Sequence, residues 1–320
     1  MPVKFYSDKR VRAPLLIACW PGMGHVGILA ASYLRVKLGG EPYAEIDATP
    51  YFLPDSIEVR DGIGTILPPP RQTLFYVAEP PLLIFEGEAQ IAGEPGIRIA
   101  SELLDVAQQA GIGTVFTGAA FATAMSYRQP SKVFGVATDE TMRQRFISLG
   151  IEPLKEGRIS GLNGLLLGLA KSRDIPAASF LATMPQYAIE APNPKASRAI
   201  IEVFLRILNT SIDMTELEER IREADRMMGE FERRVAAAIE ALRRTEETEE
   251  EEKDEEDERM SLSAETPEPH ELMAHIEQLF EEAQRDRSKA KELKEELDRW
   301  GLFHLYEDRF LDLFRKKPQE

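Results

Sequence analysis

Short apolar runs alternate with amphipathic stretches from the N-terminus to about residue 212, and this alternation is the strongest constraint on the fold. Strands and helices that alternate at this spacing predict an α/β layer fold, in which helices sandwich a largely parallel sheet. The predicted strands are Leu15–Trp20, Leu74–Val77, Leu82–Phe85, Thr114–Thr117, Lys132–Val136 and Ala178–Ala182. The predicted helices cover residues 25–38, 96–110, 139–149, 162–173 and 194–208.

From Met214 onward the pattern changes to heptads. The first set of regularly spaced apolar residues is Leu217, Ile221, Ala224, Met228, Phe231, Val235, Ala238 and Leu242. The second set, which includes one polar residue, is Leu272, Ile276, Leu279, Ala283, Asp286, Ala290, Leu293, Leu297 and Trp300. This spacing predicts a coiled-coil hairpin of two helices of roughly 28 residues each, although pairing between subunits would satisfy the same pattern.

We therefore predict two domains: an α/β domain over residues 1–212 and a helical hairpin arm over 213–320. An acidic segment separates the two heptad sets, and we expect it to form a disordered loop over 245–265 at the tip of the arm. Residues 246–258 hold eleven carboxylates and one lysine, so they contribute −10 of the net charge of −16 and the remainder contributes −6. The chain is therefore not acidic throughout.

Composition narrows the class of protein. The apolar runs are too short or too broken to span a bilayer, and the first residues lack the apolar block of a signal peptide. The single cysteine, Cys19, excludes an internal disulfide and a multi-cysteine zinc site. No basic patch with interleaved aromatic residues stands out, which disfavours nucleic-acid binding. We expect a cytoplasmic protein without a membrane partner.

A glycine-spaced turn joins the first predicted strand to the first predicted helix. Gly22, Gly24 and Gly27 fit the G-x-G-x-x-G spacing that lets backbone amides approach a pyrophosphate, and Asp47 follows at the distance expected of a ribose-binding acid. Alternatively, the glycines permit a tight turn and close packing. The candidate anion-binding or ligand-binding turn consists of Gly22, Met23, Gly24, His25 and Gly27.

Other chemical candidates are weaker. His270 and His275 are spaced H-E-x-x-x-H, which places them about 140° apart around a helix, so they cannot share one zinc ion. Cys19 lies within an apolar strand and is expected to be a small buried hydrophobe. Glu86 and Glu88 follow a strand end, where ligand sites of open sheets gather, but they fit ordinary loop carboxylates equally well. We predict no catalytic residue, metal or cofactor.

Four segments of the first half follow one another along the chain: Cys19–Ala31 (CWPGMGHVGILAA), Gly118–Asp139, Gly157–Lys171 (GRISGLNGLLLGLAK) and Ser179–Ile200. They resemble, in the same order, the motifs of the PAC2 family, the proteasome assembly chaperone family. The chain resembles the archaeal and bacterial branch of this family over most of residues 13–208. The resemblance implies a phosphorylase- or hydrolase-like α/β fold, homo-oligomeric assembly and binding of other proteins, with proteasome α subunits as the best-known clients.

These observations predict a protein-binding scaffold, a chaperone or adaptor of the proteasome-assembly type without catalysis. The alternative is an enzyme or sensor that binds a nucleoside, phosphate or dinucleotide at the turn Gly22–Gly27. In the first case apolar surface supplies the affinity. The candidate partner-binding residues are Met228, Phe231, Phe303, Tyr306, Phe310 and Phe314.

Overall fold

The structure is a computed structural model that describes residues 3–6, 10–52, 54, 56–251 and 267–314; for 245–251 it describes the backbone alone. The chain divides into two compact units. The first unit consists of residues 1–121, 130–184 and 190–221, and the second of 122–129, 185–189 and 222–320. The predicted domain boundary after residue 212 stays a prediction.

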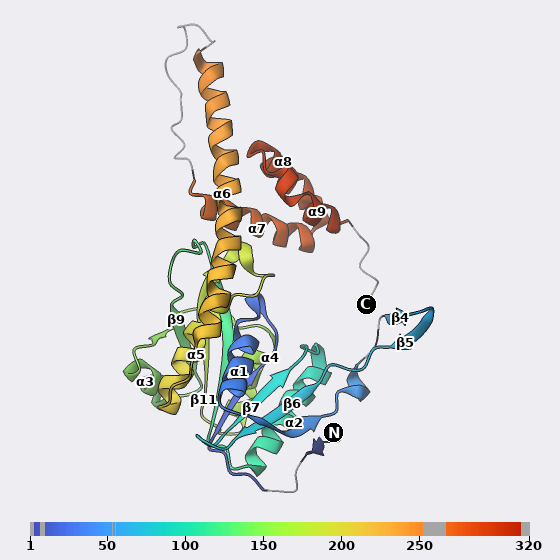
Figure 1. Cartoon of the computed structure of the whole chain (residues 1–320), viewed down its shortest axis with the longest axis vertical. Coiled ribbons are helices and arrows are strands. Elements are labelled where there is room, and N and C mark those ends of the chain that lie inside the picture. The colour runs from blue at the N-terminus through green and yellow to red at the C-terminus, as the bar shows by residue number, and fades with distance from the viewer. Residues whose placement is uncertain (1–2, 7–9, 53, 55, 252–266, 315–320) are drawn as a thin grey trace. The chain divides into compact units, whose positions relative to one another are not determined.

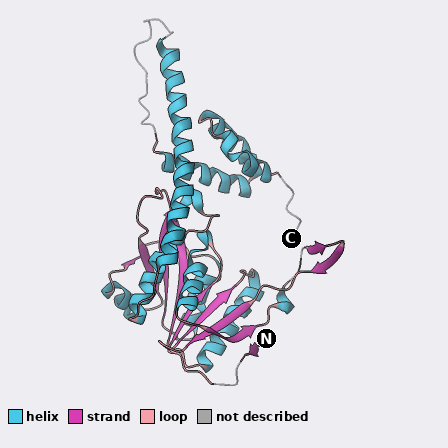
Figure 2. Cartoon of the chain, viewed as in Figure 1, coloured by secondary structure: helices cyan, strands magenta, loops and turns pink. Residues whose placement is uncertain are grey.

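A nine-stranded sheet forms the centre of the first unit (Figures 1 and 2). The strands, in spatial order, are β1 (Val3–Phe5), β3 (Glu41–Ile46), β6 (Gln72–Val77), β7 (Leu82–Gly87), β2 (Leu15–Cys19), β8 (Thr114–Thr123), β11 (Ala177–Pro185), β9 (Val133–Ala137) and β10 (Glu152–Pro153).

Pairing within this sheet is mixed. Strand β2 pairs in parallel with β7 and β8, so the centre has the predicted direction. On one flank β1, β3, β6 and β7 pair antiparallel in succession, and on the other flank β11 pairs antiparallel with β9. The sequence analysis did not anticipate β1 and β3, which extend the sheet on its antiparallel side.

Five α-helices of the described chain lie wholly in the first unit. They are α1 (Val26–Lys37), α2 (Gly93–Gln109), α3 (Glu140–Ser148), α4 (Gly161–Ser172) and α5 (Pro194–Leu208). Strand β2 is buried on both faces, and alternate residues serve the two layers. Leu16 and Ala18 belong to the core that α2 and α4 share with the sheet, whereas Cys19 faces Gly27 of α1.

Local signals fix the starts of two of these helices. The Asp139 Oδ1 atom accepts a hydrogen bond of 2.8 Å from the Met142 amide at the start of α3. The Asn193 Oδ1 atom accepts one of 2.9 Å from Ala196 at the start of α5, where Pro194 takes the first helical position. Both side chains satisfy amides that have no partner within the helix.

Strands β4 (Ile57–Arg60) and β5 (Ile63–Ile66) form a separate two-stranded antiparallel sheet (Figure 1). Asp61 and Gly62 connect them, with φ values of 50° and 79°. Two positive φ angles in a two-residue connection are the mark of a type I′ turn, which Asp-Gly favours because its twist matches that of the strands. We call this element the β4–β5 hairpin.

The second unit is helical. Helix α6 (Thr215–Glu251) enters it from the first unit, and the remaining helices are α7 (Pro269–Arg285), α8 (Ala290–Arg299) and α9 (Phe303–Asp312). One apolar cluster joins residues from all four helices, including Val235, Ile276, Leu293 and Tyr306. The apolar heptad positions of α7 and α8 thus face a shared core.

The prediction of one continuous second helix is wrong. Helix α7 ends at Arg285, and Asp286 adopts an extended conformation with φ −136° and ψ 104°. The Asp286 Oδ1 atom accepts a hydrogen bond of 3.0 Å from the Ser288 amide and begins the short 3₁₀ segment η4 (Arg287–Lys289) before α8. The polar residue that interrupted the heptads is thus a helix end, because an Asp side chain competes for backbone amides.

The structure differs from the prediction of an acidic loop over 245–265 at the start of that range, because α6 continues to Glu251. Residues 252–265 of that predicted loop lie outside the described residues. Within the part of the chain that is described, no helix combines the length and the apolar character needed to cross a bilayer.

Candidate functional site

The glycine turn forms a backbone corner between β2 and α1. Gly22 is extended, with φ −161°, and the chain then makes one 3₁₀ turn, η1 (Met23–His25). Within that turn Gly24 and His25 both have positive φ, at 58° and 50°. The His25 amide donates a hydrogen bond of 2.8 Å to the Gly22 carbonyl, and α1 begins at the next residue. We call residues 20–27 the glycine corner.

Two amide side chains hold the corner from outside. Asn163 of α4 accepts a hydrogen bond of 2.9 Å from the Trp20 amide and donates one of 3.1 Å to the Trp20 carbonyl. Gln90 donates to the Pro21 carbonyl and accepts a bond of 2.8 Å from the Leu162 amide. Asn163 is buried, so these bonds satisfy polar groups that would be costly to leave unpaired.

The space beside two of the three glycines is already filled by the protein. A Cβ atom on Gly27 would lie 2.7 Å from the carbonyl carbon of Gly118 in β8 and closer still to its oxygen. A Cβ atom on Gly24 would lie 2.7 Å from the Met184 sulfur. Of the predicted ligand-turn residues, Gly22, Met23 and His25 are exposed, whereas Gly24 and Gly27 are buried. These two glycines therefore serve close packing.

A cavity of about 160 Å³ opens beside the exposed part of the corner. Its polar lining includes Gln90, Arg158 and Asn163, and its apolar lining includes Met23 and Leu181. Sites for drug-sized ligands occupy about 300–1,000 Å³, so this cavity falls below the size that a dinucleotide needs. Gln90 and Asn163 are already bonded to backbone groups of the corner.

The position of Asp47 also argues against a dinucleotide. In dinucleotide-binding folds, the acid that binds ribose follows the strand next to the glycine turn. Here Asp47 follows β3, and strands β6 and β7 separate β3 from β2, a distance of roughly 14 Å at ordinary strand spacing. Hydrogen bonds from the Thr49 side chain and from the Thr49 amide, the latter 2.9 Å from Oδ1, instead lower the pKa of the Asp47 carboxyl.

The other candidates near the sheet have structural partners. Cys19 is fully buried, and desolvation raises the pKa of its thiol to about 12, so the nucleophilic thiolate is not populated near neutral pH. Glu86 pairs with the Arg35 guanidinium, and Glu88 accepts a hydrogen bond of 2.8 Å from the Arg71 amide. The expectation of a buried, apolar-like Cys19 is confirmed.

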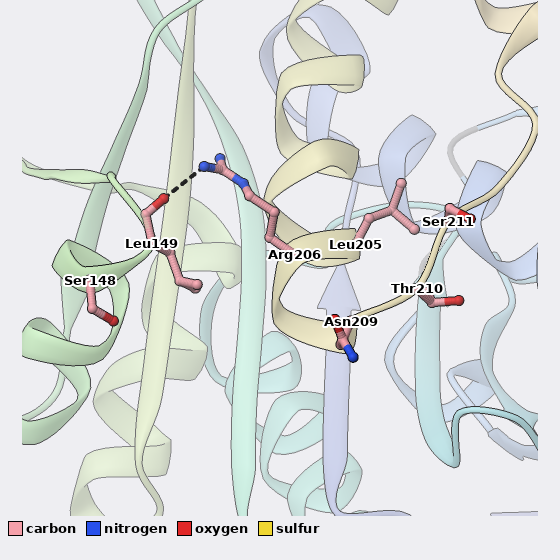
Figure 3. A pocket seen from close by; sticks show the side chains of 7 residues that line it. All are labelled: Ser148, Leu149, Leu205, Arg206, Asn209, Thr210 and Ser211. Atoms are coloured by element: carbon pink, nitrogen blue, oxygen red, sulfur yellow. Dashed lines mark hydrogen bonds between the residues drawn. The ribbon is translucent and has the colours of Figure 1, made fainter.

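A second hollow lies where α3 and α5 end (Figure 3). It is an open groove of about 810 Å³, lined by Ser148, Leu149, Leu205, Arg206, Asn209, Thr210 and Ser211. The Arg206 Nη1 atom donates a hydrogen bond of 2.7 Å to the Leu149 carbonyl, as the dashed line in Figure 3 marks. This guanidinium satisfies a carbonyl at the C-terminal end of α3. The lining includes no carboxylate, histidine or cysteine, so it lacks an acid or base for catalysis.

Comparison with known proteins establishes the family. A model of the PAC2 family matches residues 16–232, more than half of the 320 residues. The chain belongs to the PAC2 family. An uncharacterized protein of Methanocaldococcus jannaschii is 29% identical over 239 residues, which cover 73% of this chain and 90% of that relative.

Solved structures share the PAC2 fold. PbaB of Pyrococcus furiosus, described as an archaeal proteasome activator, is 25% identical with a TM-score of 0.62, covering 72% of this chain and 98% of PbaB. A proteasome-assembly chaperone homologue of Mycobacterium tuberculosis is 22% identical with a TM-score of 0.58, covering 68% of this chain and 94% of the homologue. The latter likeness concerns the fold alone.

The PAC2 match ends at Glu232, a residue that sequence reasoning missed. Its Oε1 atom accepts hydrogen bonds from the Tyr187 hydroxyl at 2.7 Å and the Tyr127 amide at 3.2 Å, and its Oε2 atom accepts one from the Ser126 hydroxyl at 3.0 Å. A Cβ atom on nearby Gly229 would lie 2.6 Å from the Tyr127 hydroxyl. An isolated glycine inside a helical pattern was the available signal, since it usually has a packing reason.

Helix α9, beyond the PAC2 match, turns most of its aromatic residues inward. The Tyr306 ring lies 5.8 Å from the rings of both Phe231 and Phe280, and Tyr306 is only 4% exposed. Phe310 is 8% exposed, whereas Phe314 is 49% exposed. Among these predicted partner-binding residues, Phe314 therefore offers the most accessible surface.

The remaining partner-binding candidates are half-buried. Met228 lies on α6, and the Phe303 ring packs against the Phe310 ring at 5.5 Å. The Lys294 Nζ atom also lies 4.6 Å from the centre of the Phe303 ring. A role for any of these side chains in binding a partner stays a prediction.

A buried ion pair ties α7 to α9. Glu277, only 1% exposed, accepts hydrogen bonds from both terminal nitrogens of Arg309, and the guanidinium carbon lies 4.4 Å from the centre of the Phe280 ring. Burial beside this pair raises the pKa of Tyr306. Such a pair strongly penalises removal of one partner, because the other is left as an uncompensated buried charge.

The described residues hold no group of three histidine, cysteine, aspartate or glutamate side chains that could bind a metal ion. His270 and His275 both lie on α7.

Proposed function

We propose that this PAC2 family member is a protein-binding scaffold of the proteasome-assembly-chaperone type. It would act in the cytoplasm as a homo-oligomer, bind proteasome α subunits and carry out no turnover chemistry. The observation that carries this proposal is the likeness to PbaB, an archaeal proteasome activator, over 98% of that protein's length. The protein's own packing at the glycine corner agrees with a scaffold, because Gly24 and Gly27 leave no cradle for a cofactor.

The partner surface we propose is the exposed end of the aromatic C-terminal segment. Leu311 and Phe314 are each 49% exposed, and the Phe314 ring lies 5.5 Å from the ring of the buried Phe310. An exposed aromatic side chain that rests on a fixed one loses little conformational freedom on binding. Burial of its apolar area then contributes affinity at about 25 cal/mol per Å² before ordering costs.

Affinity capture tests the proposal directly. The tagged full chain is incubated with native lysate of its own organism, and bound proteins are identified by mass spectrometry. We expect proteasome α subunits among them. Recovery of no proteasome subunit would remove the proposed partner while leaving the family assignment intact.

A matched pair of variants then tests the surface. Leu311→Asp combined with Phe314→Asp should abolish capture of α subunits, because two charges replace the apolar contact. Asp308→Ala, an exposed change on the same helix, should leave capture unchanged. Equal capture by the wild-type chain and the double variant would exclude this surface.

A further inference from the structure

The β4–β5 hairpin has one apolar face. Ile57 pairs with Ile66 across the two strands and Val59 pairs with Gly64, so all four residues point to the same side. The Ile57 side chain lies over Gly64, where a Cβ atom would be 2.7 Å from its Cδ1 atom. This apolar face therefore consists of Ile57, Val59 and Ile66, without a charged group.

The opposite face is largely polar. It carries Glu58, Arg60, Thr65 and Ile63. The Arg60 Nη2 atom lies 2.8 Å from the Glu58 Oε1 atom, so the charges on this side are paired with each other. An antiparallel sheet with one polar and one apolar face normally exposes the first to water and packs the second on another layer.

Among the described residues, no segment of this chain covers the apolar face of the hairpin. Ile57, Val59 and Ile66 are 58%, 61% and 65% exposed. Five of the fourteen large apolar side chains that are exposed in the described chain lie within residues 57–67. A hairpin of two strands alone is marginally stable in water, and apolar side chains gathered in this way mark an interaction site.

We propose that the apolar face of the β4–β5 hairpin packs on a second copy of this chain, in a reciprocal arrangement where each copy gives and receives one hairpin. The absence of charge on this face favours self-association, because homodimer interfaces are the more apolar ones and charges are what usually discriminate foreign partners.

The area of the apolar face also favours a second copy of this chain as the partner. Each of the three side chains exposes roughly 100 Å², so one docked hairpin and its acceptor bury about 600 Å², which is the size of a crystal-packing contact. Reciprocal docking in a two-fold dimer buries the same surfaces twice and reaches about 1,200 Å², the lower limit of stable specific interfaces. A single docking event confined to these three side chains does not reach that limit.

This inference rests on the homo-oligomeric part of the proposed function, and one experiment separates the two. Sedimentation equilibrium is measured for the full-length wild type, for Val59→Asp combined with Ile66→Asp, and for the control Thr65→Asp on the polar face. We expect an assembled wild type and control, and a dissociation constant at least a hundredfold higher for the double variant. Circular dichroism and the melting transition confirm that all three chains are folded.

The outcomes are distinct. Unchanged assembly in the double variant overturns the hairpin interface and leaves the homo-oligomer in place. A monomeric wild type overturns both. Loss of assembly in the Thr65→Asp control to the same degree also overturns the assignment to the apolar face.

A crosslinking measurement locates the acceptor without weakening the contact. The only native cysteine, Cys19, is fully buried, so a thiol introduced by Thr65→Cys, next to the apolar face but outside it, can be labelled selectively with a photoactivatable maleimide. Labelled chains are mixed with isotopically heavy, unlabelled chains, and crosslinked peptides are sorted by mass. Crosslinks between light and heavy copies support the proposal, whereas crosslinks confined to one copy overturn it. Crosslinks that join the hairpin only to another protein, in a second mixture to which lysate is added, overturn it as well.

Discussion

The glycine corner and the β4–β5 hairpin both depend on glycine, but for different reasons. At the corner Gly27 provides space, since the backbone of Gly118 occupies the place of a side chain. In the hairpin Gly62 provides conformation, since its φ is 79° and no atom lies within 4 Å of a Cβ placed there. The first region is completed by its own chain, and the second leaves its apolar side chains in solvent. The glycine corner is the more conspicuous motif in the sequence, yet it is less accessible than the β4–β5 hairpin.

The largest expected contrast is in thiol reactivity. Cys19 lies behind the corner with a thiol pKa raised from 9.0 to about 12 by burial, so at pH 8 its thiolate fraction is about a thousandfold lower than that of an ordinary thiol. Native protein should resist a thiol-specific chromogenic reagent at pH 8, while a Thr65→Cys variant, with its thiol on the polar face of the β4–β5 hairpin, should react at the rate of an exposed thiol. Rapid labelling of Cys19 in the folded wild type would contradict a closed corner.

The same pKa fixes the sign of a pH effect. The unfolded chain loses the Cys19 proton near pH 9 and the folded chain near pH 12, so the stability from this neutral thiol is fully present below pH 9. It should fall as pH rises from 9 to 12. Denaturant titrations of the wild type and Cys19→Ala at several pH values measure it, because the variant lacks this part of the alkaline loss.

Filling the corner should cost the most stability. Gly27→Val places a branched side chain against the backbone of β8, which cannot move aside as a side chain end could, and we expect a loss of about 3 kcal/mol or more. Urea denaturation measures this. Gly168→Ala on α4, where a Cβ has open space, serves as the control and should stabilise the protein by about 0.5–1 kcal/mol.

Gly24→Ala should have an intermediate effect. The new methyl group meets the flexible end of Met184, and the positive φ of 58° adds strain, so we expect a loss of about 2 kcal/mol. The thermal transition should also be unchanged by NAD, a nucleoside or phosphate in both the wild type and this variant. Stabilisation of the wild type by any of these ligands, lost in the variant, would instead support a ligand-binding corner.

The smallest effect belongs to the hairpin turn. Gly62→Ala introduces a methyl group into open space at φ 79°, and the cost of about 1 kcal/mol arises from conformation alone. Because the hairpin forms its own sheet, amide hydrogen exchange should quicken in residues 57–66 while global melting stays the same. A drop in global stability as large as that of Gly27→Val would erase the distinction between the two regions.

Local patterns predicted the central strands and the helices of the first unit well. The helix over 194–208 was predicted to the residue, because a capping Asn193 and a first-position Pro194 mark its start. Buried strands such as Leu15–Cys19 and Ala177–Pro185 were found as apolar runs. The first was predicted one residue too long, to Trp20, and the second too short, as Ala178–Ala182. These signals lie within a few residues of the elements they define.

The antiparallel additions were missed for physical reasons. Strand β3, with the sequence EPYAEI, has no long apolar run, because it lies near the edge of the sheet between β1 and β6. The β4–β5 hairpin did offer a signal in Asp61-Gly62, which sits between two short alternating segments. The sequence could not show that all residues of both strands are exposed, because alternation ordinarily indicates one buried face.

The heptad pattern predicted which residues of α7 and α8 are buried, but it did not predict where the helix ends and the chain turns. Leu279 and Leu293 belong to the same apolar cluster even though the helix ends between them. Periodicity records which face of each turn is buried, and a chain that bends at Asp286 can keep that face on one core. The contacts of Glu232 with residues 126, 127 and 187 depend on tertiary placement, so the sequence signals close packing at Gly229 but not which residues Glu232 contacts.

The pairing of Asn163 with Trp20 has a consequence for biosynthesis. The two residues are 143 positions apart, yet the end of strand β2 obtains both of these hydrogen bonds from α4. A ribosome adding about 5–20 residues per second needs roughly 7–29 s to make the intervening polypeptide. During that interval the nascent chain presents an incomplete N-terminal segment with unpaired backbone groups at Trp20.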